Sequence, residues 1–305
     1  MDIAIMIEGQ QGLTWRRWQR LCAAVEQLGF AGIYRSDHFT DPEPPAQDSL
    51  ELWVSLTWAA SHTRRIDFGP LVAPVSFRDP IMMARMAAQI DDLSGGRLEL
   101  GLGAGWNVRE HTMFGYPLLE TPERFARFTE ALDVTARLLK GDGPQHYAGQ
   151  YYKLRDAQLL PRPARRAGPP LVVGGNGPRR TLPLAARYAD QWNGVYLTAA
   201  RFAALNATLD GLLDAAARPR TAVKRTLMTG LTFGQSPGAV RERLPAGQSV
   251  DALRERGVVV GTPDELGPQL ATLRAEGVQR LMLQWLALDD LAGLEQLARA
   301  VIQPA

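Results

Sequence analysis

Residues 94–111, SGGRLELGLGAGWNVREH, combine glycines with side chains that can bind or react with a ligand. Residues 97–102 alternate long side chains with leucine, which is typical of a buried strand. Three glycines at alternate positions would let another group approach the backbone: Gly101, Gly103 and Gly105. Trp106 and Asn107 follow, and residues 109–111 add polar groups. The stretch predicts a strand ending in a loop that holds a planar ligand, with a tight turn without a ligand as the alternative.

A second glycine-rich segment indicates a phosphate site. Residues 172–180 read VVGGNGPRR, a strand followed by the start of a helix. The loop would present four backbone N–H groups to an anion at the positive end of the helix dipole: Gly174, Gly175, Asn176 and Gly177. Arg179 and Arg180 fall in the first turn, where cations are unfavourable unless an anion is bound. We therefore expect a ligand with a planar part and a phosphate, the alternative being a simple glycine turn.

His38 is the strongest candidate for acid–base chemistry. It lies beside Asp37 in a polar, proline-rich loop, residues 36–49, after a predicted strand. A neutral imidazole can exchange a proton near pH 7, and a neighbouring carboxylate can fix its tautomer or polarise a ligand. A surface histidine is the alternative. His62 matches a helix C-terminal cap, and without HxH or HExxH spacing no metal site is predicted.

Composition narrows the class of protein. With 305 residues and 46% apolar content, the chain can bury a large core as one domain, residues 1–305. Cys22 is the single cysteine and falls in a helical run, which favours a packing role. The net charge of +2 gives no reason to expect nucleic acid. No apolar run is long enough for a bilayer and the first residues carry an acid, so we expect a cytoplasmic protein.

Strand-like and helix-like segments alternate along most of the chain. The predicted strands are residues 2–8, 32–35, 67–73, 97–102, 170–173, 191–196, 225–233 and 277–283. The predicted helices are residues 14–28, 50–61, 80–93, 122–140, 177–188, 199–217, 263–276 and 288–302. Residues 237–244 and 250–256 fit the alternation less well. About eight such units predict an α/β fold, a single-domain (β/α)8 TIM barrel, with an open doubly wound sheet as the second choice.

The alternation of strands and helices is interrupted in residues 141–170. This segment predicts a small hairpin about Gly149 and a proline-rich connection, inserted on the barrel. Elsewhere the barrel expectation brings three loops together. The segments after the second, third and fourth strands would open on the face formed by the strands' carboxyl ends, where barrel enzymes have their active sites. His38, the segment from Val72 and the segment after Gly103 would therefore line one site.

The whole set of motifs resembles the luciferase-like monooxygenase superfamily and, within it, the branch that uses the deazaflavin coenzyme F420. The segments that carry the resemblance are residues 34–39 (YRSDHF), 77–80 (FRDP), 94–111, 172–193 and 261–266 (GTPDEL). Together they cover nearly the whole chain. FMN-dependent relatives share the barrel and several of its loops.

The resemblance implies a flavin ring over the ends of the third and fourth strands, beside a bulge with a non-proline cis peptide. We expect that peptide between Val72 and Ala73, with the bond between Ala73 and Pro74 as the alternative. His38 matches the family's proton-transfer histidine. The residues implied in cofactor binding are Asp37, Val72, Ala73, Pro74, Ala104, Gly105, Asn107, Gly174, Gly175, Asn176, Gly177 and Arg180.

One residue departs from the family pattern. Sugar-phosphate dehydrogenases of this branch carry a glutamate at the position of Trp106, so a less polar substrate is expected here. The predicted reaction is hydride transfer between coenzyme F420 and an alcohol or carbonyl, an imine or an activated alkene. His38 would exchange the substrate proton and Asp37 would bind the ring and orient His38. Substrate contacts would come from residues that could equally be core: Glu8, Trp53, Trp106 and Trp285.

Other expectations complete the prediction. The coenzyme's acidic tail would cross Arg162, Arg165 and Arg166, unless these are a solvated surface run. The alternatives are an FMN-dependent monooxygenase served by a partner reductase, a catalytically silent flavin carrier, and a phosphate-binding aldolase or isomerase. No lysine lies at a predicted strand end, which argues against a Schiff-base aldolase. Family analogy suggests a homodimer.

Overall fold

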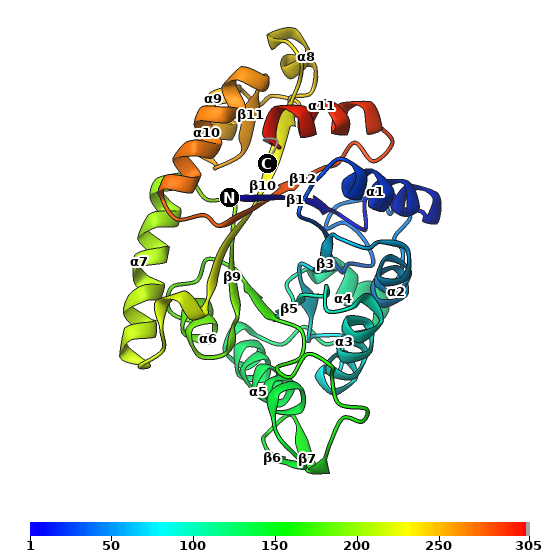
Figure 1. The fold of residues 1–305 in the computed structure, drawn as a ribbon, viewed down its shortest axis with the longest axis vertical. Helices are drawn as coiled ribbons and strands as arrows, with labels where there is room; N and C mark the ends of the chain where they lie inside the picture. Colours follow the sequence, from blue (N-terminus) through cyan, green and yellow to red (C-terminus); the bar gives the residue numbers. More distant parts are fainter. Residues whose placement is uncertain (303–305) are drawn as a thin grey trace.

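A computed structural model describes residues 1–302. Figure 1 looks along a barrel of parallel strands ringed by helices. The ten strands of this sheet are β1 (Asp2–Ile7), β2 (Gly32–Arg35), β3 (Asp67–Pro70), β4 (Ala73–Pro74), β5 (Leu100–Gly103), β8 (Leu171–Gly174), β9 (Gln191–Val195), β10 (Lys224–Phe233), β11 (Val259–Gly261) and β12 (Arg280–Gln284).

The ten strands fill the eight positions of a (β/α)8 barrel. β3 and β4 are two parts of one position, interrupted by two residues, and β11 pairs only with β10. The ring closes because β1 pairs with both β2 and β12, while the N–H of Phe68 bonds the Arg97 carbonyl at 3.1 Å and the N–H of Glu99 bonds the Phe68 carbonyl at 2.9 Å. The predicted barrel is confirmed, and the open sheet is not found.

The interruption between β3 and β4 corrects one prediction. The non-proline cis peptide joins Leu71 and Val72, one residue before the expected bond. Ala73 and Pro74 already pair with Leu102 and Gly103 of β5, so the bulge has to come before them.

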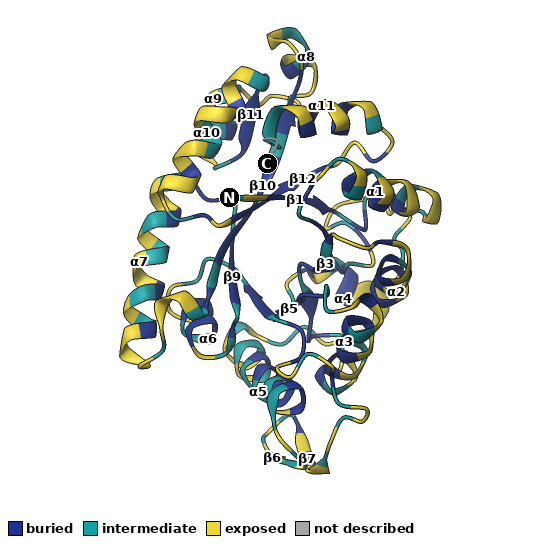
Figure 2. Ribbon diagram, in the orientation of Figure 1, coloured by how far each residue is buried: buried dark blue, intermediate teal, exposed yellow. Residues whose placement is uncertain are grey.

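Helices cover the outside of the barrel. They are α1 (Trp15–Gln27), α2 (Leu52–His62), α3 (Pro80–Ser94), α4 (Val108–Phe114), α5 (Thr121–Lys140), α6 (Thr181–Tyr188), α7 (Ala199–Ala215), α8 (Pro237–Glu242), α9 (Val250–Glu255), α10 (Pro263–Ala275) and α11 (Leu291–Val301), with a 3-10 turn at Arg220–Ala222. In Figure 2 the strands are buried, whereas the helices turn exposed residues outward. Parallel strands buried on both faces explain the continuous apolar runs of the sequence.

Local signals in the sequence account for several helix starts. The Asp79 side chain accepts the N–H groups of Ile81 and Met82 at 2.9 Å, with Pro80 as the first residue of α3. Thr262 and Glu265 form a capping box at the start of α10. The structure adds α8 and α9 in the two segments that fit the alternation less well, and it adds α4 and β11, which apolar spacing does not predict.

The predicted insertion forms a hairpin of β6 (Gln145–Ala148) and β7 (Lys153–Ala157), which projects from the barrel in Figure 1. Glu130 of α5 anchors its turn. The carboxylate accepts the backbone N–H groups of Gln150, Tyr151 and Tyr152 at 2.8, 2.9 and 3.2 Å. Among the helices of residues 1–302, none has both the length and the apolar character needed to cross a membrane.

Candidate active site

A cavity of about 440 Å³ opens at the carboxyl ends of the barrel strands. Its walls come from the loops or ends of β1, β2, β3, β5, β8, β9 and β10. Eight residues of the sequence prediction line it: Glu8, His38, Val72, Pro74, Gly105, Trp106, Gly174 and Gly175. The loops after the second, third, fourth and fifth strand positions thus meet at one cavity, as parallel strands in a closed barrel require.

His38 reaches the cavity with its ring held by a buried carboxylate. Its Nδ1 lies 2.9 Å from Oε1 of Glu110, a residue only 1% exposed. The other oxygen, Oε2, accepts the backbone N–H of Phe39 at 2.9 Å. Because an ionised carboxylate only accepts hydrogen bonds, the imidazole proton lies on Nδ1, and the lone pair of neutral His38 is on Nε2.

The surroundings of His38 favour its protonated form. Burial works to lower the pKa of His38, but the hydrogen bond and the charge of Glu110, with smaller effects of Glu8 and Asp37, outweigh burial, and the pKa is raised above 6.5. The ring edge also meets Trp106, with centroids 5.4 Å apart and planes at 80°. His38 is therefore fixed in direction, and its pKa lies above the ordinary value for histidine.

Asp37 does not orient His38, which corrects the prediction for this residue. Its carboxylate turns to Arg78 in a two-pronged ion pair, with Nε to Oδ2 at 2.9 Å and Nη2 to Oδ1 at 2.8 Å. Arg78 also pairs with Glu51 at 2.7 Å. Burial raises the pKa of Asp37, and Arg78 opposes this only in part. Asp37 is not among the cavity-lining residues, because the strong partner for its buried charge lies on the loop before α3.

The glycines after β3 and β5 make room for protein atoms. A Cβ on Gly101 would lie 2.2 Å from the Pro70 carbonyl oxygen, and one on Gly103 would lie 2.5 Å from Val72 Cγ2. These two glycines accept the bulge between β3 and β4. The group that approaches the backbone at these two glycines therefore belongs to the protein, whereas Gly105 lines the cavity.

A chain of polar side chains forms the wall opposite the bulge. Tyr196 Oη donates to Gln284 Oε1 at 2.6 Å, and Gln284 Nε2 donates to Glu8 Oε1 at 2.7 Å. Gln10 Nε2 donates to Glu8 Oε2 at 3.0 Å, and Ser36 Oγ donates to Gln10 Oε1 at 2.7 Å. Burial, and then the charge of Glu8, raise the pKa of Tyr196, so its phenol is neutral. Both oxygens of Glu8 thus accept amide protons beside the cavity.

The loop after β8 has the features of an anion site, with part of the predicted set of donors. The Gly175 N–H bonds the Asn193 carbonyl at 2.9 Å, and the side-chain amide of Asn176 bonds both the N–H and the carbonyl of Val195. In residues 1–302 the backbone N–H groups of Asn176, Gly177, Arg179 and Arg180 have no hydrogen-bond partner. They precede the first turn of α6 and can accept an anion there.

The cavity and this loop fit a phosphorylated flavin-type cofactor. Asn193 lines the cavity, is 1% exposed, and its Oδ1 has no hydrogen-bond partner in the described part of the chain. Such a buried oxygen is satisfied by a hydroxyl or N–H donor on a ligand. Gly174 and Gly175 lead from the cavity to the free N–H groups near Gly177, so a ring in the cavity and a phosphate at the loop can belong to one molecule.

Several predicted contacts lie elsewhere. Trp53 and Trp285 are 4% and 3% exposed and pack in the main core, with Trp285 Nε1 bonded to the Ala287 carbonyl at 2.9 Å. Ala73 is fully buried in the same core, and Ala104 packs against it. Asn107 caps α4 and donates to the Thr40 carbonyl at 2.9 Å. The proposed ligand contacts of these side chains are corrected, because each is occupied by packing or a protein hydrogen bond.

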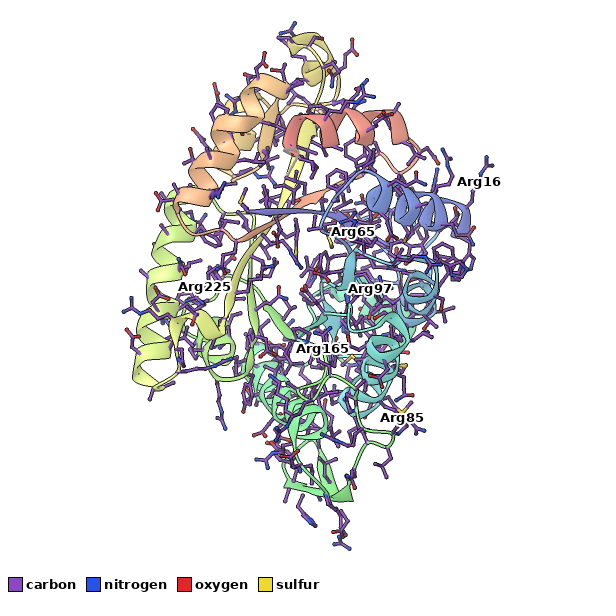
Figure 3. The ribbon with its side chains drawn as sticks, in the orientation of Figure 1. Arg16, Arg65, Arg85, Arg97, Arg165 and Arg225 are labelled. Atoms are coloured by element: carbon purple, nitrogen blue, oxygen red, sulfur yellow. The ribbon has the colours of Figure 1, made fainter. Side chains whose placement is uncertain are left out.

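The three arginines expected to hold an acidic tail are also elsewhere. Arg165, labelled in Figure 3, pairs with Asp91 at 3.0 Å near the C-terminus of α3. Arg162 donates to the carbonyls of Leu138 and Leu139 near the C-terminus of α5. Arg166 lies near Asp142 at 3.7 Å. Helix C-termini lie at the barrel end opposite the cavity, so these side chains cannot reach it.

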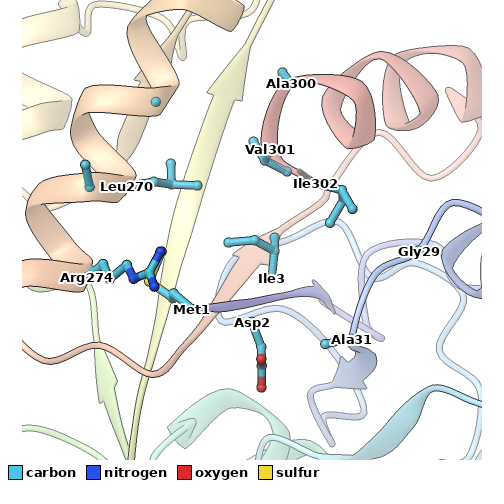
Figure 4. A pocket seen from close by; sticks show the side chains of 12 residues that line it. Met1, Asp2, Ile3, Gly29, Ala31, Leu270, Arg274, Ala300, Val301 and Ile302 are labelled. Carbon is cyan, nitrogen blue, oxygen red and sulfur yellow. The ribbon is translucent and has the colours of Figure 1, made fainter. Parts of the chain in front are cut away.

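A second cavity, of about 390 Å³, lies at that opposite end between α10, α11 and the start of β1 (Figure 4). Met1, Leu270, Arg274 and Val301 are among its lining residues. Cys22 is buried in the core, and burial raises the pKa of its thiol well above its usual range. In residues 1–302 no three His, Cys, Asp or Glu side chains are grouped to hold a metal ion.

Comparison with known proteins identifies the family. Residues 1–248 match the model of the luciferase-like monooxygenase family. The chain belongs to this family. Its relatives include an F420-dependent glucose-6-phosphate dehydrogenase of Intrasporangium calvum, 31% identical over 77% of this chain and 71% of that protein. Another is 4-hydroxyprotoasukamycin monooxygenase of Streptomyces nodosus subsp. asukaensis, 34% identical over 61% of this chain and 48% of the relative, so that alignment spans about half of it.

Solved structures agree on the fold. An F420-dependent secondary alcohol dehydrogenase in complex with an F420-acetone adduct superposes with a TM-score of 0.82 at 18% identity, over 99% of both chains. The EDTA monooxygenase of Chelativorans sp. BNC1 superposes with a TM-score of 0.80 at 14% identity, over 98% of this chain and 93% of that chain. The relatives named in these comparisons are oxidoreductases, and the present chain is an oxidoreductase of the same family.

The functional residues missed in the sequence are those whose partners are distant in it. Glu110 was interpreted as part of a loop, because residues 108–114 lack an apolar stripe. Their helix ends were visible nevertheless: Asn107 caps α4 by accepting the Arg109 N–H at 3.2 Å, and Gly115 ends it in the left-handed conformation. Tyr196, Gln284 and Asn193 carry no motif, and only barrel closure brings them to the cavity.

Proposed function

We propose that this protein transfers a hydride between coenzyme F420 and a small, weakly polar organic substrate, an alcohol or carbonyl, an imine or an activated alkene. The observation that carries the proposal is the His38–Glu110 pair, which presents an oriented imidazole to a cavity that continues into an anion-binding loop. Names among the relatives and structural neighbours support F420 as the cofactor.

The residues suited to hold the coenzyme divide between ring and phosphate. Val72, Pro74 and Gly105 would face the ring, and the N–H groups of Gly177 and Arg180 would hold the phosphate. When bound, the deazaflavin supplies the hydride acceptor or donor. Binding energy from the phosphate then positions the ring without contacting the reacting atoms.

His38 moves the proton. In alcohol oxidation Nε2 takes the hydroxyl proton, and the Glu110 carboxylate stabilises the imidazolium that results. In carbonyl reduction protonated His38 returns the proton to the forming hydroxyl. Trp106 and the bulge residue Val72 restrict the space around the ring and exclude water from part of the cavity.

The residues that line the cavity favour a substrate that carries no phosphate. Its lining contains Glu8 and His38 as ionisable acid–base groups, but no lysine or arginine of residues 1–302. Glucose 6-phosphate, the substrate in the name of the Intrasporangium calvum relative, carries a dianion that such a wall would not stabilise. The apolar lining residues, which include Met6, Leu71 and Met228, favour a weakly polar molecule.

A second candidate is an FMN-dependent monooxygenase that receives reduced flavin from a partner reductase. The monooxygenase relative at 34% identity and the similar fold of the EDTA monooxygenase favour it. A catalytically silent flavin-binding protein is a third. We further propose a single domain, residues 1–305, that works as a cytoplasmic homodimer.

Titration of the protein with coenzyme F420 and with FMN tests which of the two is the cofactor. We expect quenching of deazaflavin fluorescence with saturable binding, and deazaflavin turnover with at least one alcohol, ketone, imine or enone of a substrate panel. Tight FMN binding without any affinity for the deazaflavin would reverse the assignment. Cofactor binding with no turnover on any substrate, unchanged in His38→Ala, would support the silent carrier.

A further inference from the structure

Four arginines border the cavity at the starts of α5 and α6, and we call them the arginine rim: Arg124, Arg127, Arg179 and Arg180. In residues 1–302 none of them lies within 4.0 Å of a carboxylate oxygen, although 21 such ion pairs, including those of histidines, occur elsewhere. Arg180 lies over the Phe125 ring of α5, 5.7 Å from its centroid, which links the two helix starts.

Arg124 contacts the cavity wall from behind, and Arg127 lies one turn further along α5. Arg124 Nη1 donates to the carbonyl of Gly105, a lining residue, at 2.9 Å, and its buried Nε has no partner in the described residues. Arg127 Nε donates to the Tyr152 hydroxyl at 3.0 Å, and its Nη1 lies 3.5 Å from the Ser76 carbonyl. Neither guanidinium has a negative charge to balance it.

Ser76 marks the space between these arginines and the cavity. Its side chain is 5% exposed, and its Oγ has no hydrogen-bond partner in residues 1–302. That oxygen lies 2.2 Å from where a Cβ of Gly105 would stand. Ser76 therefore adds a buried hydroxyl without a partner between Arg127, which faces its carbonyl, and the cavity residue Gly105.

Helix dipoles make the arrangement unfavourable without an anion. Arg124 lies in the first turn of α5, and Arg179 and Arg180 directly precede α6, so cations gather at two positive helix ends. A single phosphate at Gly177 would compensate the nearest charges only. The outer residues Arg179 and Arg180 are exposed and extend the positive charge away from the cavity.

We propose that the arginine rim binds an oligocarboxylate chain that continues from the phosphate of the bound coenzyme. This inference rests on the proposed function, because among the candidate cofactors coenzyme F420 carries such an acidic tail and FMN does not. The rim replaces the predicted track at Arg162, Arg165 and Arg166, which are engaged at the other end of the barrel. Multiple exposed charges would bind the tail in a salt-dependent way.

Fluorescence titrations with three probes test the rim. They are coenzyme F420 with a long acidic tail, the same coenzyme with a short tail, and the deazaflavin nucleoside without phosphate or tail. We expect the long-tailed form to bind most tightly, and its advantage over the short-tailed form to shrink at high salt. Arg179→Glu should weaken binding of the long-tailed form about tenfold and leave the nucleoside unchanged.

Arg166→Glu is the matched control, because it reverses an exposed arginine at the opposite end of the barrel. It should leave the affinity for all three probes within about twofold. Equal affinities for long and short tails, or no effect of Arg179→Glu, would contradict the proposal that the arginine rim binds the tail, while the proposed function would stand. Failure of all three probes to bind the parent protein would instead overturn the proposed function.

Discussion

Glu110 holds two neighbouring groups of the loop after β2 with its two oxygens: Oε1 lies 2.9 Å from Nδ1 of His38, and Oε2 accepts the Phe39 N–H at 2.9 Å. The carboxylate comes from α4, on the far side of the bulged strand position. One side chain therefore fixes both the ring and the backbone that carries it. The direction of Nε2 toward the cavity depends on this contact, and the following experiments measure its consequences.

Glu110→Gln should shift the acidic limb of the pH profile for substrate oxidation to lower pH. Burial lowers the pKa of His38, but Glu110 outweighs burial and keeps that pKa above 6.5. Oxidation needs neutral His38, so the rate falls as the pH drops through this pKa. An amide lacks the charge of Glu110, so the limb should move to lower pH. Glu295→Gln on the exposed face of α11 is the control and should leave the pH profile unchanged. An unchanged acidic limb in Glu110→Gln would show that Glu110 does not set the pKa of His38.

His38→Ala should lower turnover by about a hundredfold or more and change cofactor affinity by no more than a few fold, because it removes proton transfer and leaves the anion loop intact. Stopped-flow single turnovers measure the chemical step, and fluorescence titration measures binding. His146→Ala, on the exposed hairpin, should change neither quantity. An unchanged single-turnover rate in His38→Ala would mean that another group transfers the substrate proton.

Gly177→Val should weaken binding of phosphorylated cofactor by about tenfold or more while the phosphate-free deazaflavin binds as before. A Cβ there would lie 3.0 Å from Thr181 Oγ1, beside the free N–H groups, and each lost charge-assisted bond costs about 1.5–3 kcal/mol. Gly175 is less suitable, since its φ of 122° strains any side chain. Gly211→Val, where the new Cβ meets nothing within 4 Å, is the control. If the folded Gly177→Val protein bound phosphorylated cofactor with the parent's affinity, the phosphate would have to bind at a different site.

Trp106→Ala should raise KM about tenfold for the best apolar substrate of the panel with little change in kcat, because it removes binding surface and leaves His38 and Glu110 in place. Trp106 is 56% exposed and touches His38 edge to face. Trp15→Ala, a tryptophan that is 40% exposed on α1, provides the comparison. A fall in kcat with constant KM would indicate that Trp106 positions His38 instead.

Arg280→Met should lower the free energy of unfolding by about 3–5 kcal/mol, since it leaves the buried carboxylate of Glu99 without its cation. Arg280 is 4% exposed inside the barrel and donates to Glu99 at 2.9 Å and to Asp67 at 2.7 Å. Urea denaturation measures the difference. Arg299→Met removes an exposed pair with Glu295 and should cost less than about 1 kcal/mol. Equal effects of the two substitutions would argue against the buried cluster as a source of stability.

The sequence was most informative where a signal is local. The glycine loop before α6 and the position of His38 after β2 follow from neighbouring residues, and the barrel follows from the repeated alternation of strand and helix patterns. Partner choice across the barrel was not accessible. Asp37 stands beside His38 in the chain, yet Arg78 has a matching two-pronged geometry and takes that carboxylate, which leaves the role of orienting His38 to Glu110.

The tryptophans illustrate the same limit. Trp53, Trp106 and Trp285 were equivalent as candidates, and burial separates them: two fill the core and one remains at the cavity mouth. Nothing in the local sequence distinguishes an aromatic ring that packs under a helix from one that faces a ligand, because the difference lies in which distant residues surround it.

The hydrogen bond between Glu8 and Gln284 spans the seam where β1 and β12, the first and last strands of the barrel, pair. During synthesis, Glu8 leaves the ribosome first, and its amide partner follows 276 residues later. Until then the Glu8 carboxylate has only the Gln10 amide as a donor, so this wall of the cavity forms only after the two strands have paired.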